Sequence, residues 1–224
     1  MVVVQGPAGP LEALIDRAGD GSPLRAAVVF AHPHPQYGGS MHTKVVFRGA
    51  KALARLGCEV LRFNFRGVGQ SAGTFDYGEG EMADFRAAID FMAARHPGRP
   101  IWAAGMSFGA WVALETGAAD DRVSLLLAIA PPVDRYEFAA VRACTKPKFL
   151  IHGESDDLVA VQDVWRFYGG LAEPKDLVVI DAADHLFDGR ASEVADAIED
   201  LLSDYAETDT NRTRNAHGTK TEEG

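Results

Sequence analysis

The pentapeptide Gly105-Met-Ser-Phe-Gly109 (GMSFG) joins two segments of different character and is the strongest indication of the fold class. Residues 101–104 are apolar, as in a buried strand, whereas residues 108–115 continue as a helical run. The pattern G-x-S-x-G at such a junction predicts a sharp strand-to-helix turn, whose glycines remove side chains that would collide. This turn lifts the Ser107 hydroxyl clear of the sheet, in front of the free N–H groups of a helix start. Ser107 is therefore a candidate nucleophile.

Short apolar, β-branched runs recur on both sides of this turn and predict the strands of one sheet. They lie at residues 2–4, 13–16, 26–31, 59–63, 101–104, 125–130, 149–151 and 177–180. After the first two, the runs do not alternate in polarity, which is typical of parallel strands that are buried on both faces.

Stripes of apolar residues at helical spacing lie between these runs and predict helices that pack on the sheet. The stripes are Val46, Ala50, Leu53 and Leu56; Met82, Phe85, Ile89 and Met92; and Val194, Ile198, Leu201 and Tyr205. The repeated strand–helix–strand order predicts an α/β fold: a doubly wound, mostly parallel sheet of about eight strands, with helices on both faces. An antiparallel pair of strands is expected to open the sheet.

The length of 224 residues suits one well-filled α/β core, and we expect residues 1–206 to form a single domain. Residues 207–224 contain no Leu, Ile, Val or aromatic residue. Such a segment cannot offset its ordering entropy by burial, so we expect a disordered C-terminal tail.

Charge and composition argue against several classes of function. A net charge of −10 without a basic cluster disfavours nucleic acid and anionic membranes as partners. No apolar run exceeds the six residues of 125–130, which is far shorter than a membrane span, and the N-terminus lacks the basic start of a secretory signal. Cys58 and Cys144 lie outside any CxxC spacing, which favours reduced thiols. We expect a cytoplasmic protein that acts on a small molecule, either as a monomer or as a homodimer.

A serine nucleophile needs a base, and His185 is the candidate. In chains with this turn, the partners of the serine follow in the order Asp or Glu, then His. The run at 177–180 leads into Asp181-Ala-Ala-Asp-His185, at the carboxyl end of its strand. Carboxyl ends of parallel strands meet at one edge of a sheet, so His185 is expected beside Ser107.

The carboxylate that orients this base is expected in the loop after the run at 149–151. Three acidic residues lie there, Glu154, Asp156 and Asp157. We favour Asp156 and keep Asp157 as the alternative, with the other two capping the next helix or facing water.

These motifs together resemble the α/β-hydrolase superfamily, over about residues 10–205. HPHPQYGG (32–39), LRFNFRGVGQSAG (61–73), GMSFGA (105–110), IHGESDD (151–157) and ADHLF (183–187) occur in the order of that family. More narrowly, the chain resembles small, lidless serine hydrolases akin to dienelactone hydrolases, although those proper have Cys where this chain has Ser107. Only about 15 residues, 131–145, are available for a cap before the next strand. We therefore expect no cap domain and an open site for small soluble esters.

The resemblance also implies an oxyanion hole made of two backbone N–H groups. One belongs to Phe108, directly after the nucleophile. The other comes from the loop at 32–39, where both neighbours of His34 are prolines without an N–H, which leaves His34 as the donor. A metal site at His32 and His34, with His42, is a less favoured alternative, because the spacing supplies no third oriented ligand.

Further residues are expected to support or line the site. Arg66 and Ser71 match the Arg-Gly-x-Gly-x-Ser turn of the family and are interpreted as structural ties, with substrate contact as the alternative. His32, Tyr37 and Phe75 are placed at the pocket or its support by position alone.

The expected function is that of a serine hydrolase that cleaves small soluble carboxylic esters through an acyl-enzyme, with no cofactor and no metal. A thioesterase or a peptidase with the same triad is the alternative, because one constellation serves all three acyl groups. A non-catalytic binding protein of the same fold is a third interpretation.

Overall fold

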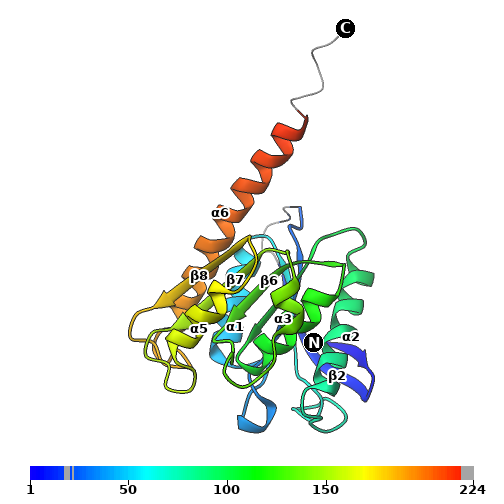
Figure 1. Ribbon diagram of the computed structural model, residues 1–224. Helices are drawn as coiled ribbons and strands as arrows, with labels where there is room; N and C mark the ends of the chain where they lie inside the picture. The colour runs from blue at the N-terminus through cyan, green and yellow to red at the C-terminus, as the bar shows by residue number, and fades with distance from the viewer. Residues whose placement is uncertain (18–20, 22, 218–224) are drawn as a thin grey trace.

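The strands of the protein form one mixed sheet. The computed structural model describes residues 1–17, 21 and 23–217 (Figure 1). The described residues contain eight strands in the spatial order β1-β2-β4-β3-β5-β6-β7-β8. They are β1 (Val2–Gly6), β2 (Gly9–Asp16), β3 (Ala27–Ala31), β4 (Glu59–Phe63), β5 (Ile101–Met106), β6 (Val123–Ile129), β7 (Lys148–Gly153) and β8 (Lys175–Ile180). All eight predicted strands are confirmed, with ends that differ by a few residues.

Strand direction follows the predicted pattern. β1 pairs with β2 and β2 with β4 in antiparallel fashion, and the other neighbours are parallel. Every residue of β3, β4 and β5 is buried, which explains why these runs show no alternation of polarity. Ala31 is in register with Gly105, and Met106 with Ile129. The carboxyl ends of β3, β5 and β6 therefore lie side by side.

Helices cover both faces of the sheet (Figure 1). α1 (Lys44–Arg55) and α6 (Ala191–His217) pack on one face, in a core with Phe30, Val60 and Phe187. The opposite face carries α2 (Glu79–Arg95), α3 (Phe108–Ala119), α4 (Ala139–Ala143) and α5 (Val161–Gly169). A short 3-10 helix, η1 (Pro35–Tyr37), follows β3. The three apolar stripes predicted as helices are those of α1, α2 and α6.

No cap domain interrupts the described chain. Between β6 and β7 the only helix is α4, which the sequence analysis missed because five residues are too few to display an apolar stripe. No helix in the described part of the chain has both the length and the apolar character that crossing a bilayer requires.

The last helix is longer than its apolar stripe. α6 continues from Tyr205 to His217 and projects from the body of the molecule (Figure 1). The expectation of a disordered tail covers residues 207–224, of which 218–224 lie outside the described residues. Disorder of this segment stays a prediction.

Candidate active site

Ser107 lies at the apex of the turn between β5 and α3. Its backbone has φ 53 and ψ −122, a conformation that costs a non-glycine residue free energy. The Ser107 N–H donates to the Ile129 carbonyl at 2.8 Å and holds the turn against β6. A Cβ atom on Gly105 would lie 2.1 Å from the Gly109 oxygen, and one on Gly109 would lie 2.4 Å from the His32 oxygen. Both positions of the motif therefore require glycine.

His185 joins Ser107 to Asp156. Its Nε2 lies 2.9 Å from Ser107 Oγ, and its Nδ1 lies 2.7 Å from Asp156 Oδ2. This arrangement fits a ring that carries its proton on Nδ1, donates it to the carboxylate, and accepts the serine hydroxyl at Nε2. His185 and Asp156 are both buried, so water competes little for these bonds. The structure thus brings together three residues that the sequence places in three distant loops.

Asp156 is the acidic residue of its loop that faces the imidazole. Its Oδ1 accepts hydrogen bonds from the N–H groups of Leu158 and Val159, both at 2.9 Å. Burial alone would raise the pKa of Asp156, but the bonds from His185 and these N–H groups hold it below its ordinary value. Glu154 and Asp157 are exposed, and Glu154 accepts from the Ala182 N–H instead. Neither caps α5, which has no side-chain cap.

A second histidine, His152, lies beside the same carboxylate and was not assigned by the sequence analysis. Its Nε2 lies 2.9 Å from the Val159 carbonyl oxygen and 3.5 Å from Asp156 Oδ2. Burial lowers the pKa of His152, so the ring is neutral and supports the loop that holds Asp156. Its position at the end of β7, before the acidic loop, was the available signal.

The two expected oxyanion donors are the backbone N–H groups of His34 and Phe108. Neither the His34 N–H nor the Phe108 N–H donates to another described residue. Phe108 is the first residue of α3, and the His34 ring packs on the Phe108 ring with centroids 4.9 Å apart. Both residues line one cavity with Ser107 and His185.

His32 supports this loop from inside the protein. It is fully buried, its Nδ1 lies 2.6 Å from the Pro33 oxygen, and its Nε2 accepts from the Phe65 N–H at 3.1 Å. Burial lowers the pKa of His32 to about 4, so the ring is neutral and donates from Nδ1. Among the described residues, no cluster of three His, Cys, Asp or Glu side chains is arranged to hold a metal ion.

Arg66 and Ser71 tie backbone segments together below the site. Arg66 forms a bidentate ion pair with Asp84, at 2.9 and 2.8 Å, and its N–H donates to the same carboxylate. The Ser71 hydroxyl donates to the Asn64 carbonyl at 2.7 Å and accepts from the Glu12 N–H. Neither residue lines the cavity.

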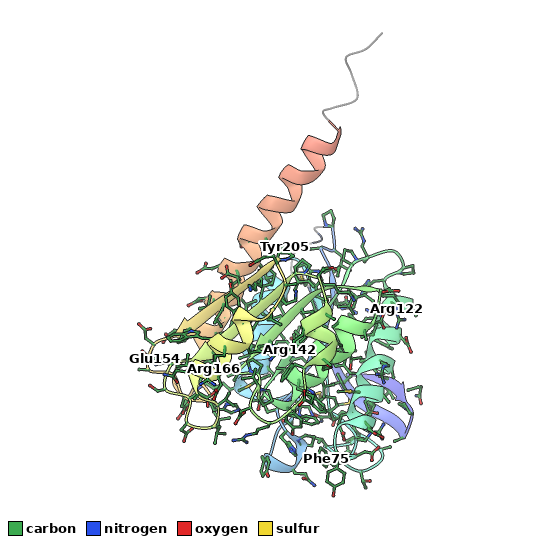
Figure 2. The ribbon with its side chains drawn as sticks, viewed as in Figure 1. Phe75, Arg122, Arg142, Glu154, Arg166 and Tyr205 are labelled. Atoms are coloured by element: carbon green, nitrogen blue, oxygen red, sulfur yellow. The ribbon has the colours of Figure 1, made fainter. Side chains whose placement is uncertain are left out.

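The cavity beside Ser107 has a volume of about 600 Å³. Its lining residues come from several loops at the carboxyl edge of the sheet: Pro33, His34, Tyr37, Ser107, Phe108, Pro132, Arg135, Tyr136, Leu158, Val159, His185 and Leu186. Tyr37 is among them. Phe75 is not, and packs on the His34 ring at a centroid distance of 4.9 Å. Figure 2 shows Phe75 at the end of the molecule opposite Tyr205 of α6.

The cavity wall formed by Arg135, Tyr136 and Leu158 was not predicted from the sequence. These residues follow the ends of β6 and β7, and that position was the only available signal. Cys58 and Cys144 are free and buried away from this cavity.

Comparisons with known proteins agree with the fold. The family model for serine aminopeptidase, S33, matches residues 22–139. An uncharacterised protein of Rickettsia prowazekii is 36% identical over 210 residues, which cover 90% of this chain and 87% of that protein.

Two solved structures are similar in both sequence and fold. An α/β serine hydrolase homologue from Coxiella burnetii has a TM-score of 0.85 and 36% identity, covering 90% of this chain and 96% of its own. A lidless α/β serine hydrolase from Xanthomonas campestris has a TM-score of 0.84 and 35% identity, covering 91% and 93%. With its eight-stranded sheet and its strand-to-helix serine turn, the chain belongs to the α/β-hydrolase superfamily, among the lidless serine hydrolases.

Proposed function

We propose that the protein hydrolyses small carboxylic esters through an acyl-enzyme on Ser107. The observation that carries the proposal is the His185 imidazole, which lies within hydrogen-bond distance of both Ser107 Oγ and Asp156 Oδ2. A serine hydroxyl is a weak nucleophile unless a base takes its proton and a third group holds that base in the right tautomer. The contact with Ser107 supplies the base, and the contact with Asp156 holds that base in the right tautomer.

In the first half of the reaction, Ser107 Oγ attacks the ester carbonyl and its proton passes to His185 Nε2. Asp156 accepts the Nδ1–H bond of the resulting imidazolium and stabilises its charge. The His34 and Phe108 N–H groups bind the oxygen on which negative charge develops. The bond to the alcohol then breaks, and the alcohol leaves with the proton from Nε2.

In the second half, water attacks the acyl-serine and loses its proton to Nε2. Collapse of the second tetrahedral intermediate releases the acid and returns the proton to Ser107. The open cavity without a cap favours small esters, since no lid shields a long acyl chain from water.

The test compares wild type, Ser107→Ala and Ser124→Ala in labelling by a fluorophosphonate probe and in turnover of p-nitrophenyl butyrate. Ser124 lies near the amino end of β6, where its hydroxyl bonds to the Ile101 carbonyl, so its loss is a matched control. We expect labelling and turnover in wild type and Ser124→Ala and neither in Ser107→Ala. Turnover that survives Ser107→Ala, or absence of labelling in wild type, contradicts the proposal.

A peptidase is the second candidate, because the family model that matches the chain is named for serine aminopeptidases. An aminoacyl p-nitroanilide in the same assay distinguishes it from an esterase, and an acyl-coenzyme A substrate adds the thioesterase alternative. If kcat/KM for the anilide exceeds that for the ester, the peptidase is favoured.

A further inference from the structure

The cavity beside Ser107 carries one fixed positive charge on its wall. Of the described residues that line it, Arg135 is the only Lys or Arg, and none is Asp or Glu. A fixed cation at an otherwise apolar cavity selects for an anionic group on the ligand.

The position of Arg135 is coupled to that of the catalytic triad. Its Nη2 donates to the Leu158 carbonyl at 3.0 Å, and the Leu158 N–H donates to Asp156 Oδ1 at 2.9 Å. One residue therefore links the guanidinium to the carboxylate that orients His185. The guanidinium is therefore bonded to the same loop that holds the Asp156 carboxylate.

The guanidinium of Arg135 can also bind a group on a ligand. Its side chain is 52% exposed, and its Nε forms an ion pair with the exposed Asp134 carboxylate at 3.6 Å, a separation longer than that of a hydrogen bond. The bond to Leu158 uses one of the five N–H donors of the guanidinium. A carboxylate on a ligand could take two of the others in the paired geometry that Arg favours.

The rest of the cavity suits a carbon skeleton. Tyr136 is held by stacking on Trp111, with centroids 4.3 Å apart and an angle of 20° between the rings. Tyr37 and Leu186 line the same cavity and are largely exposed, and Leu158 is about half exposed. Exposed apolar side chains that gather at one place are typical of a binding surface. These surfaces fit an apolar or aromatic body that lies between the ester and its charged group.

We propose that the substrate of this site is an ester that bears a carboxylate, and that Arg135 binds this carboxylate and determines specificity. The inference rests on the proposed function, because it concerns substrates that Ser107 attacks. Arg135 takes no part in bond breaking. Its effect is to raise kcat/KM for anionic esters relative to neutral esters of the same shape.

The experiment uses two matched pairs of esters. Mono-p-nitrophenyl adipate and p-nitrophenyl hexanoate differ by a carboxylate at the end of the acyl chain. Para-acetoxybenzoate and para-acetoxybenzamide differ by a carboxylate on the alcohol side. The measured quantity is the ratio of kcat/KM, anionic over neutral, after correction for the rates of alkaline hydrolysis. The pair that shows the preference identifies the side of the ester that faces Arg135.

Three variants separate the charge of Arg135 from other effects. Arg135→Gln removes the charge, Arg135→Lys keeps it, and Arg166→Gln removes an exposed positive charge on α5, outside the cavity lining (Figure 2). We expect a wild-type ratio of about three to ten in one pair. This ratio should fall to about one in Arg135→Gln, stay partly raised in Arg135→Lys and be unchanged in Arg166→Gln.

If wild type shows ratios near one in both pairs, the inference is wrong. The proposed function still holds in that case, because the esters are turned over. A preference that survives Arg135→Gln also overturns the inference, because the attraction then comes from elsewhere. If no ester in the panel is turned over, inactivation rates with alkyl phosphonates that carry or lack a terminal carboxylate supply the same ratio. Failure of every phosphonate to label Ser107 instead removes the proposed function, and the inference with it.

Discussion

The Ser107 N–H donates to the carbonyl of Ile129, the last residue of β6, at 2.8 Å. This bond crosses from one parallel strand to the turn that leaves its neighbour, and it helps to hold Ser107 at φ 53. Ser107 is thus kept in a conformation that its own side chain disfavours, since the surrounding sheet stabilises the turn.

Replacing Ser107 by Gly should therefore stabilise the protein relative to Ser107→Ala. Both variants lack the hydroxyl, but only glycine adopts this backbone conformation without steric cost. We expect the free energy of unfolding of Ser107→Gly to exceed that of Ser107→Ala by about 1 kcal/mol, measured by urea denaturation. Equal stability of the two variants would show that the turn is unstrained.

The assignment of the carboxylate predicts opposite outcomes for two neighbouring residues. Asp156→Asn should lower kcat for p-nitrophenyl butyrate by about 10³ to 10⁴, because an amide no longer holds His185 in the reactive tautomer. Asp157→Asn is the matched control, since Asp157 is exposed, and its kcat should stay within about twofold of wild type. A large loss in Asp157→Asn with activity kept in Asp156→Asn would reverse the assignment.

Two variants of His34 distinguish the effect of its backbone N–H from that of its side chain. His34 has φ −53, which proline adopts, and its N–H bonds to no described residue. His34→Pro lacks this N–H, whereas His34→Ala keeps it. Because an oxyanion donor acts in the transition state, we expect kcat of His34→Pro to lie about 10²-fold or more below that of His34→Ala. Similar kcat values in both variants argue against this donor.

Acid should destabilise the protein through His32. Its pKa in the folded protein is about 4, below the ordinary value of 6.5, because burial disfavours the charged ring. The unfolded chain therefore takes up the proton first, and stability present above pH 6.5 is lost as the pH falls toward 4. The loss from this residue is about 3 kcal/mol. His32→Gln should show a correspondingly smaller decrease in the free energy of unfolding over this range; an identical decrease would rule out His32 as its source.

The absence of a cap predicts a preference for short acyl chains. Among p-nitrophenyl esters, kcat/KM for acetate or butyrate should exceed that for palmitate, because the cavity of about 600 Å³ has no lid to cover a long chain. Rates are compared below the concentration at which the long ester aggregates. Faster hydrolysis of palmitate would require an apolar surface that the open cavity does not offer.

Most of the fold could be predicted from local patterns. Every strand coincided with an apolar run. β3 and β5 are buried along their whole length, which explains why their runs are apolar throughout. The main helices α1, α2 and α6 showed stripes because each buries one side against the sheet. The five residues of α4 are too few for a stripe, and the length of α6 beyond Tyr205 does not follow from apolar contacts.

Part of the candidate site could likewise be predicted from the sequence. The serine turn could be predicted from the sequence, and so could the loops after β7 and β8 that carry Asp156 and His185, because short motifs reflect local backbone requirements such as the two glycines that flank Ser107. The folded structure was needed to show that Asp156 rather than Asp157 faces the imidazole, that His152 lies against the same carboxylate, and that Arg135 bonds to Leu158. These contacts join loops that no periodicity connects, and their geometry depends on the register and twist of strands far apart in the chain.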